Sequence, residues 1–167
     1  MNIKYKKILM ISTFLLQIDQ LSKLFIRNNY PFSYLKSVYG KGQVIIDKIF
    51  YISNVENTGA AWGSFSGNTI FLSFLSIIIF WVLFKFAMKE KLNNLKTIYY
   101  GMLFAGILGN LIDRLLLGYV TDFLNFYIFS YDYPVFNFAD IFIVFGVLLC
   151  LIDIARGEGL WYVTKII

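Results

Sequence analysis

The chain of 167 residues contains no histidine, one cysteine and two prolines. The absence of histidine excludes Ser-His-Asp and Cys-His catalytic arrangements, and it also excludes zinc sites with histidine ligands. The single cysteine, Cys150, cannot form a disulfide within the chain and has no partner for a cysteine-based metal site. Any catalysis is therefore left to carboxylate, lysine or hydroxyl chemistry.

Charged residues are also scarce. They make up 15% of the chain, whereas 59% of it is hydrophobic and 20% is aromatic. A soluble domain of this length is closer to half apolar, so this composition and the mean hydropathy of +0.68 indicate an integral membrane protein. The net charge of +5 fits cytoplasmic loops that face anionic lipid. No basic cluster is interleaved with aromatic residues, so we expect no nucleic-acid partner.

Four apolar runs have about the length needed to cross a bilayer, at about residues 8–26, 69–84, 97–117 and 137–154. Basic residues gather before the first run, between the second and third runs, and after the fourth run. The positive-inside rule then places both termini in the cytoplasm and the other two connections outside. We therefore predict an all-α polytopic membrane protein whose residues 1–167 form a single membrane-embedded domain.

The two outer connections differ in character. Residues 27–68 include two short β-branched or aromatic runs, 44–46 and 49–52, which predict a small extracytoplasmic β-element. Residues 118–136 contain no Lys or Arg and many Phe and Tyr residues, which is typical of an amphipathic segment lying in the membrane interface. Its central part, residues 124–134, is a candidate lid over a site at the outer membrane edge.

The predicted spans carry polar residues near their outer ends. Asp19 and Lys23 lie four residues apart, so on a helix they share a face and form either an ion pair near the interface or part of a polar site. Asn110, Asp113 and Arg114 also share a face, either as part of a functional site or as a purely structural network. The inner half of the bundle offers no comparable set, because there Asp153 stands alone close to Arg156.

Two further carboxylates, Asp122 and Asp140, are predicted at this same outer edge. A carboxylate beside a bilayer is costly and usually functional. In a low dielectric, two carboxylates share one proton, so that one activates water and the other polarises a carbonyl group. Asp113 is the rival partner, but its neighbour Arg114 tends to keep it ionised. The residues therefore predict an intramembrane aspartyl peptidase.

Two other functions compete with this prediction. A small transporter or channel would spread its polar residues through the membrane depth, whereas here they gather at one edge. A scaffold without catalytic activity would use the same polar residues to hold its helices together, and composition alone leaves that alternative open.

Five short motifs follow one another along the chain: DQLSK at residues 19–23, NTGAAWG at 57–63, GNLIDR at 109–114, GYVTDF at 118–123 and FNFAD at 136–140. In this combination and order they resemble the lipoprotein signal peptidases, the type II signal peptidases of bacteria. Relative to that family, residues 39–43 look like an insertion, so the form of residues 31–53 stays open.

The resemblance implies an aspartyl endopeptidase that uses Asp122 and Asp140 as its catalytic pair, at the outer leaflet edge of the bacterial cytoplasmic (inner) membrane. The implied reaction removes the signal peptide from a prolipoprotein that carries a diacylglyceryl group, and cleavage falls just before the lipidated cysteine. It needs no metal and no cofactor. The implied partners are this prolipoprotein, membrane lipid and inhibitors of the globomycin type. The residues expected to bind substrate or support the pair are Asp19, Lys23, Asn57, Gly59, Asn110, Asp113, Arg114 and Asn137.

Overall fold

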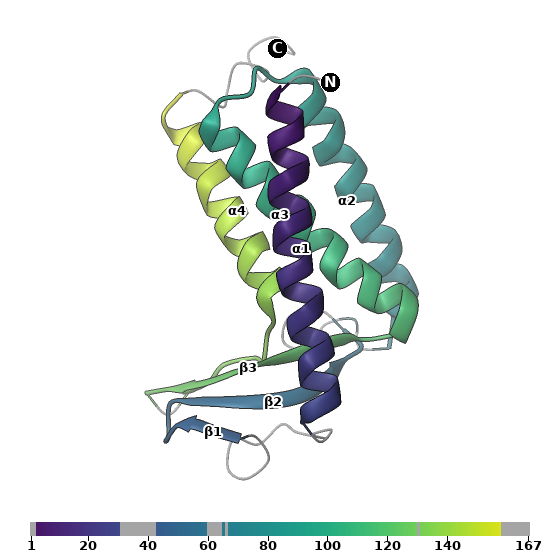
Figure 1. Ribbon diagram of the computed structural model, residues 1–167, viewed down its shortest axis with the longest axis vertical. Helices are drawn as coiled ribbons and strands as arrows, with labels where there is room; N and C mark the ends of the chain where they lie inside the picture. Colours follow the sequence, from purple (N-terminus) through teal and green to yellow (C-terminus); the bar gives the residue numbers. More distant parts are fainter. Residues whose placement is uncertain (1–2, 31–42, 60–64, 66, 130, 158–167) are drawn as a thin grey trace.

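The computed structural model describes residues 3–30, 43–59, 65, 67–129 and 131–157 (Figure 1). Most of the expected insertion lies outside the described residues, and so do residues 60–63 of the NTGAAWG motif. The element bounds and contacts given below refer to the described part of the chain.

Within that part, four helices are long and apolar enough to cross a membrane, which confirms the predicted fold class. They are α1 (Ile3–Asn29), α2 (Thr69–Lys89), α3 (Asn94–Leu117) and α4 (Phe138–Ala155). Each covers one of the expected apolar runs, except that Asn137 precedes α4 as its cap. Figure 1 shows the four helices side by side, with the small sheet across one end of the bundle.

Helix α3 forms the centre of the bundle, with 61% of its most apolar window buried, against 17–22% for the other three helices. Small residues allow its neighbours to approach closely. A methyl group added at Gly106 would meet the carbonyl oxygen of Ala139 and, at 2.6 Å, Cγ1 of Ile143 on α4. One added at Gly109 would lie 2.5 Å from Oδ2 of Asp19 on α1. These glycines therefore set the spacing of α1, α3 and α4.

The sheet is antiparallel, with the strand order β1-β2-β3-β4. Its strands are β1 (Gln43–Ile46), β2 (Phe50–Asn57), β3 (Val120–Ile128) and β4 (Tyr131–Asp132). Pairing of β1 with β2 confirms the small β-element expected from the sequence. β1 is the outermost strand of this order, and its four residues are all exposed, including the apolar Val44, Ile45 and Ile46.

The register between β2 and β3 brings together residues that are far apart in sequence. Asn57 pairs with Val120, and Val55 pairs with Asp122. Gly118 makes this arrangement possible, since it ends α3 with φ of 81°, a conformation that favours glycine, and lets the chain turn directly into β3. The start of β3 is thereby held beside the end of α3.

Most of the connection from α3 to α4, which the sequence predicts as an amphipathic segment in the interface, forms the strands β3 and β4. Some of its aromatic side chains pack on other rings, whereas Phe129 is exposed. Phe50 stacks on Phe126 with ring centroids 4.5 Å apart, and Phe126 stacks on Phe136 at 5.8 Å. The buried Ile26 of α1 packs against this layer and joins the bundle to the sheet.

At the opposite end of the bundle, our expectation that Asp153 stands alone is wrong. Lys96 lies 3.6 Å from Oδ2 of Asp153 and 2.7 Å from Oε2 of Glu90. Asp153 and Lys96 are both buried. This ion group joins the start of α3 to the end of α4 and to the connection that precedes α3.

We predict that Gly106→Ala lowers stability by about 1–3 kcal/mol, because its added methyl group collides with the backbone of α4, which cannot rotate away. Gly101→Ala is the matched control on the same helix. Its methyl group meets the side chain of Ile11 at 2.6 Å, and a side chain can shift more easily than backbone. Thermal unfolding of both variants in the same detergent tests this order, and an equal loss of stability would contradict it.

Candidate active site

Asp140 lies in the first turn of α4 and is fixed there by a reciprocal pair of hydrogen bonds with Asn137. The backbone N–H of Asp140 donates to Oδ1 of Asn137 at 3.1 Å, and the N–H of Asn137 donates to Oδ2 of Asp140 at 3.2 Å. This is a capping box, which satisfies two N–H groups at the start of a helix. The second oxygen of Asp140 accepts a hydrogen bond from Nδ2 of Asn110 on α3 at 2.8 Å. Both carboxylate oxygens therefore have defined partners.

Asp122 lies on β3 and faces the same residues from the side of the sheet. Its Oδ1 accepts a hydrogen bond from Nδ2 of Asn137 at 2.6 Å, and its Oδ2 accepts one from Nδ2 of Asn57 at 2.8 Å. Asn137 thus contacts both carboxylates at once. Asp122 and Asp140 also line the same cavity of about 640 Å³. The structure therefore brings the two predicted carboxylates to one place, although they come from different elements.

The surroundings of Asp122 favour its protonated form. Its side chain is almost completely buried. Burial, followed by the nearby charge of Asp140, raises the pKa of Asp122 to about 8, while the hydrogen bonds from Asn57 and Asn137 act in the opposite direction. Two neighbouring carboxylates that cannot both ionise easily retain one proton between them. The pair can therefore offer a carboxylate and a carboxylic acid at neutral pH.

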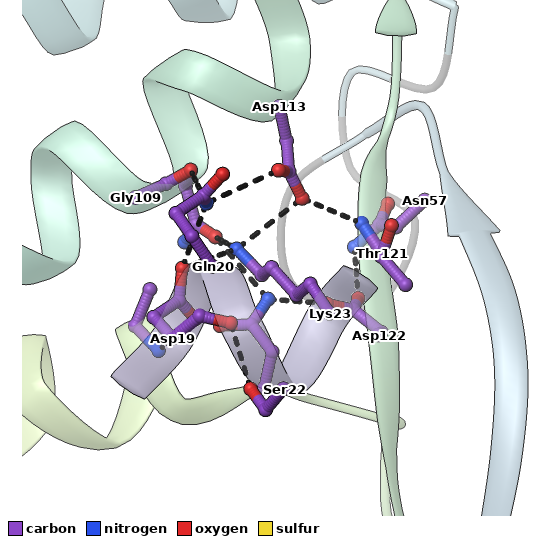
Figure 2. A network of polar contacts seen from close by, with 12 residues as sticks. Asp19, Gln20, Ser22, Lys23, Asn57, Gly109, Asp113, Thr121 and Asp122 are labelled. Carbon is purple, nitrogen blue, oxygen red and sulfur yellow. Dashed lines mark hydrogen bonds and ion pairs between the residues drawn. The ribbon is translucent and has the colours of Figure 1, made fainter. Parts of the chain in front are cut away.

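Behind the pair, a buried ion group joins α1 to α3 (Figure 2). Lys23 lies 2.9 Å from Oδ2 of Asp19 and 3.3 Å from Oδ2 of Asp113. All three side chains are buried. Lys23 also donates to Oδ1 of Asn110 at 3.0 Å, and Asn110 in turn donates to Asp140. The ammonium group of Lys23 is therefore linked to the carboxylate pair through one intervening side chain, that of Asn110.

The geometry favours a supporting role for Asp113, which the sequence left as a rival for the catalytic pair. Its Oδ2 accepts a hydrogen bond from the backbone N–H of Thr121 at 3.0 Å. Its Oδ1 lies 3.9 Å from Nη1 of Arg27. Both oxygens thus face donors or cations, and the bond to Thr121 holds β3 at the residue directly before Asp122.

Arg114 and Gly59 contact each other at the edge of the site. Nη2 of Arg114 donates to the carbonyl oxygen of Gly59 at 3.2 Å. The backbone N–H of Gly59 donates to Oδ1 of Asn57 at 2.9 Å, which orients the amide that reaches Asp122. Nε of Arg114 is buried and has no hydrogen-bond partner among the described residues, and Arg114 lines the cavity. This N–H group is therefore available to a ligand in the cavity.

The structure adds two residues, Gln20 and Arg27, that the sequence analysis did not single out. Gln20 donates from Nε2 to Oδ2 of Asp19, to the carbonyl oxygen of Gly109 and to Oδ1 of Asp113 (Figure 2). Its side chain therefore covers one side of the ion group around Lys23. Arg27 donates to Oγ1 of Thr121 at 2.9 Å. Gln20 belongs to the DQLSK motif, and Arg27 follows Lys23 by four residues on the same helix face, so both could have been found from their spacing.

Comparisons with known proteins point to one family. A sequence profile of the family described as Signal peptidase (SPase) II matches residues 11–156. The chain is 41% identical over 145 residues to the lipoprotein signal peptidase of Staphylococcus carnosus (strain TM300), covering 86% of this chain and 87% of that protein.

Two solved structures are also similar, both described as bacterial membrane enzymes studied by the in meso method. The first, at 2.3 Å resolution, has a TM-score of 0.80 and 35% identity, and the match covers 89% of this chain and 87% of that one. The second, at 1.9 Å resolution, has a TM-score of 0.76 and 36% identity, with 88% and 91% covered.

We predict that Lys23→Met destabilises the fold by about 3–5 kcal/mol, because it leaves Asp19 and Asp113 buried without their cation. Lys89→Met is the matched control, since it makes the same change at an exposed residue at the end of α2. Thermal unfolding of both variants tests this, and a Lys23→Met protein as stable as the control would contradict it.

Proposed function

Because this chain belongs to the signal peptidase II family, a family of peptidases, we propose that it is an aspartic endopeptidase of lipoprotein processing. It removes the signal peptide from diacylglyceryl-modified prolipoproteins and cleaves just before the lipidated cysteine. The observation that carries this proposal is that Asn137 links Asp122 and Asp140 beside one cavity. Its side-chain amide donates to the carboxylate of Asp122, and its backbone N–H donates to the carboxylate of Asp140.

The proposed reaction uses the pair as one acid and one base. The ionised carboxylate removes a proton from a water molecule, whose oxygen attacks the carbonyl carbon of the scissile peptide bond. The protonated carboxyl donates a hydrogen bond to the carbonyl oxygen and stabilises the charge that develops there. Collapse of the tetrahedral intermediate breaks the C–N bond, and the proton passes to the departing amino group of the cysteine.

Other residues near the pair would position the substrate. The Nε–H of Arg114, which has no partner in the part of the chain that the structure describes, can donate to a carbonyl oxygen of the bound chain. Asn57 and Asn137 hold Asp122, while Asn110 holds Asp140. Behind the residues that contact the pair lie Asp19, Lys23 and Asp113. Gly59 orients Asn57. We therefore propose a supporting role for these four residues. Inhibitors of the globomycin type would occupy the same cavity.

The four apolar helices and the family place the protein in the bacterial inner membrane. For its orientation we propose that both termini are cytoplasmic. The basic residues Lys4, Lys89 and Lys91 support this, since they lie at or near the ends of α1 and α2 that point away from the sheet (Figure 1). The carboxylate pair then lies at the outer leaflet edge of a single membrane-embedded domain, where a lipid-modified substrate can arrive sideways through the bilayer.

We predict that Asp122→Asn and Asp140→Asn each lower kcat by roughly 10² to 10⁴-fold, since each removes a group that transfers a proton. Asp47→Asn makes the same change on the exposed turn between β1 and β2 and should leave turnover unchanged. The measurement is cleavage of a diacylglyceryl-modified prolipoprotein by purified protein. Near-normal turnover of either variant would mean that the pair is misassigned, and thermal unfolding separates lost chemistry from lost folding.

The pH dependence of cleavage provides a second test. The pKa of Asp122 is raised to about 8, so the pair keeps its shared proton at neutral pH and loses it as the pH rises through that value. We therefore predict that kcat/KM of the wild type falls above about pH 8. A decline that begins near the pKa of an ordinary aspartate, about 4, would contradict this.

Stability should depend on pH through the same group. Below about pH 4, Asp122 is protonated in both the folded and unfolded chains and its burial has no pH-dependent cost. As the pH rises from there to about 8, only the unfolded chain gains by ionising, so wild-type stability should fall relative to Asp122→Asn and then level off. Thermal unfolding across this range, with Asp47→Asn as the control, measures the difference.

A further inference from the structure

The cavity that holds the carboxylate pair continues along the bundle as a groove, which we name the α2–α4 groove. Residues of α2 and α4 form its walls and residues of α3 its floor. The polar groups of Asn57, Arg114 and the pair gather at the end nearest the sheet. Farther along, the lining is almost entirely apolar, with Ile79 on α2 and Val147 on α4 as representatives of the two walls.

The α2–α4 groove is open to the surrounding lipid. Helix α2 makes most of its helix contacts with α3. The wall residues Ile79, Val144 and Val147 are 42%, 55% and 44% exposed. A hydrocarbon chain can therefore enter the groove sideways without passing through water.

The groove ends before it reaches the other end of the bundle. Its last lining residues, including Leu83 and Cys150, pack against a buried cluster that contains Ala87, Tyr99 and Tyr100. The ion group of Lys96 lies in the same region and offers no apolar continuation. An occupant of the groove must therefore end there, whereas a membrane-spanning helix would have to continue to the opposite face.

The length of the groove matches that of a fatty acyl chain. Its wall on α4 runs from Asp140 to Leu151, and eleven residues of helix span about 16 Å. An extended hydrocarbon chain advances about 1.2 Å per bond, so roughly 13 bonds fit along the groove.

We propose that the α2–α4 groove holds one fatty acyl chain of the diacylglyceryl group on the substrate cysteine. The ester end lies beside the carboxylate pair and the methyl end points toward Leu151. This inference rests on the proposed function and adds the part of the substrate that the groove recognises. Because the chain exchanges lipid for protein, it gains little hydrophobic energy, and its effect is to hold the peptide bond beside the pair.

Chain length provides the test. Val147 lies seven residues beyond Asp140, about 10 Å along α4, so a palmitoyl chain passes it. An octanoyl chain, about 9 Å long, ends before it. Val147→Trp should therefore block only the longer chain. Leu148→Trp is the matched control, because Leu148 is 48% exposed to lipid on the same helix but does not line the groove.

The substrates are two prolipoprotein peptides that differ only in a dioctanoyl or a dipalmitoyl glyceryl group, cleaved by enzyme in phospholipid nanodiscs. We expect Val147→Trp to lower kcat/KM about tenfold for the dipalmitoyl substrate, as misplacement of the reacting bond would, and to leave the dioctanoyl substrate almost unaffected. Ile79→Trp on the opposite wall should do the same, with Ile78→Trp as its control at the same exposure of 42%. Two independent walls keep the test valid if one variant fails to fold.

Three outcomes would overturn the proposal. An equal loss for both substrates would mean that the groove holds the signal-peptide helix, and no loss for either would mean that it holds no part of the substrate. In both cases wild-type cleavage that depends on Asp122 would leave the proposed function intact. Failure of the wild type to cleave either substrate would instead overturn the proposed function, and the acyl occupant with it.

Discussion

The arrangement of the site depends on one buried ammonium group, that of Lys23. Removing ions from water is costly inside a membrane protein, and Asp19 and Asp113 offset that cost because they lie 2.9 and 3.3 Å from the ammonium nitrogen. The three residues fasten α1 to α3. Through Asn110 and Thr121, the same group reaches Asp140 on one side and the start of β3 on the other. Charges placed to hold helices together therefore also determine where the two carboxylates lie.

Neutral amides complete the arrangement around the carboxylates. Asn137 caps α4 with its oxygen and donates to Asp122 with its nitrogen, so the start of a helix and the start of a strand share one side chain. Asn57 and Asn110 each add one donor. Cations at these positions would keep both carboxylates ionised, whereas amides orient them and still allow them to share a proton.

Much of this could be predicted from the sequence, because apolar runs and short motifs depend on local composition. The contacts between elements could not. Arg27 and Thr121 are neighbours only after α1 packs beside β3, and Asp153 has Lys96 as a partner only after α4 packs on α3. That an aromatic stretch such as β3 forms a strand is not evident until its pairing with β2 is known. The α2–α4 groove likewise forms only when three helices pack together, so the sequence of a single helix does not predict it.

The exposed strand β1 has a consequence for membranes of different thickness. Val44, Ile45 and Ile46 are adjacent, so they present apolar groups on both faces of the sheet at its outermost strand. Groups of this kind are stable in the headgroup region and unfavourable in water. In the proposed orientation, these groups would hold the sheet at the level of the lipid surface, and with it the carboxylate pair at its base. In a thinner or thicker bilayer, the helices would tilt, and their ends farthest from the sheet would absorb the mismatch. The carboxylate pair would keep its depth relative to the lipid surface.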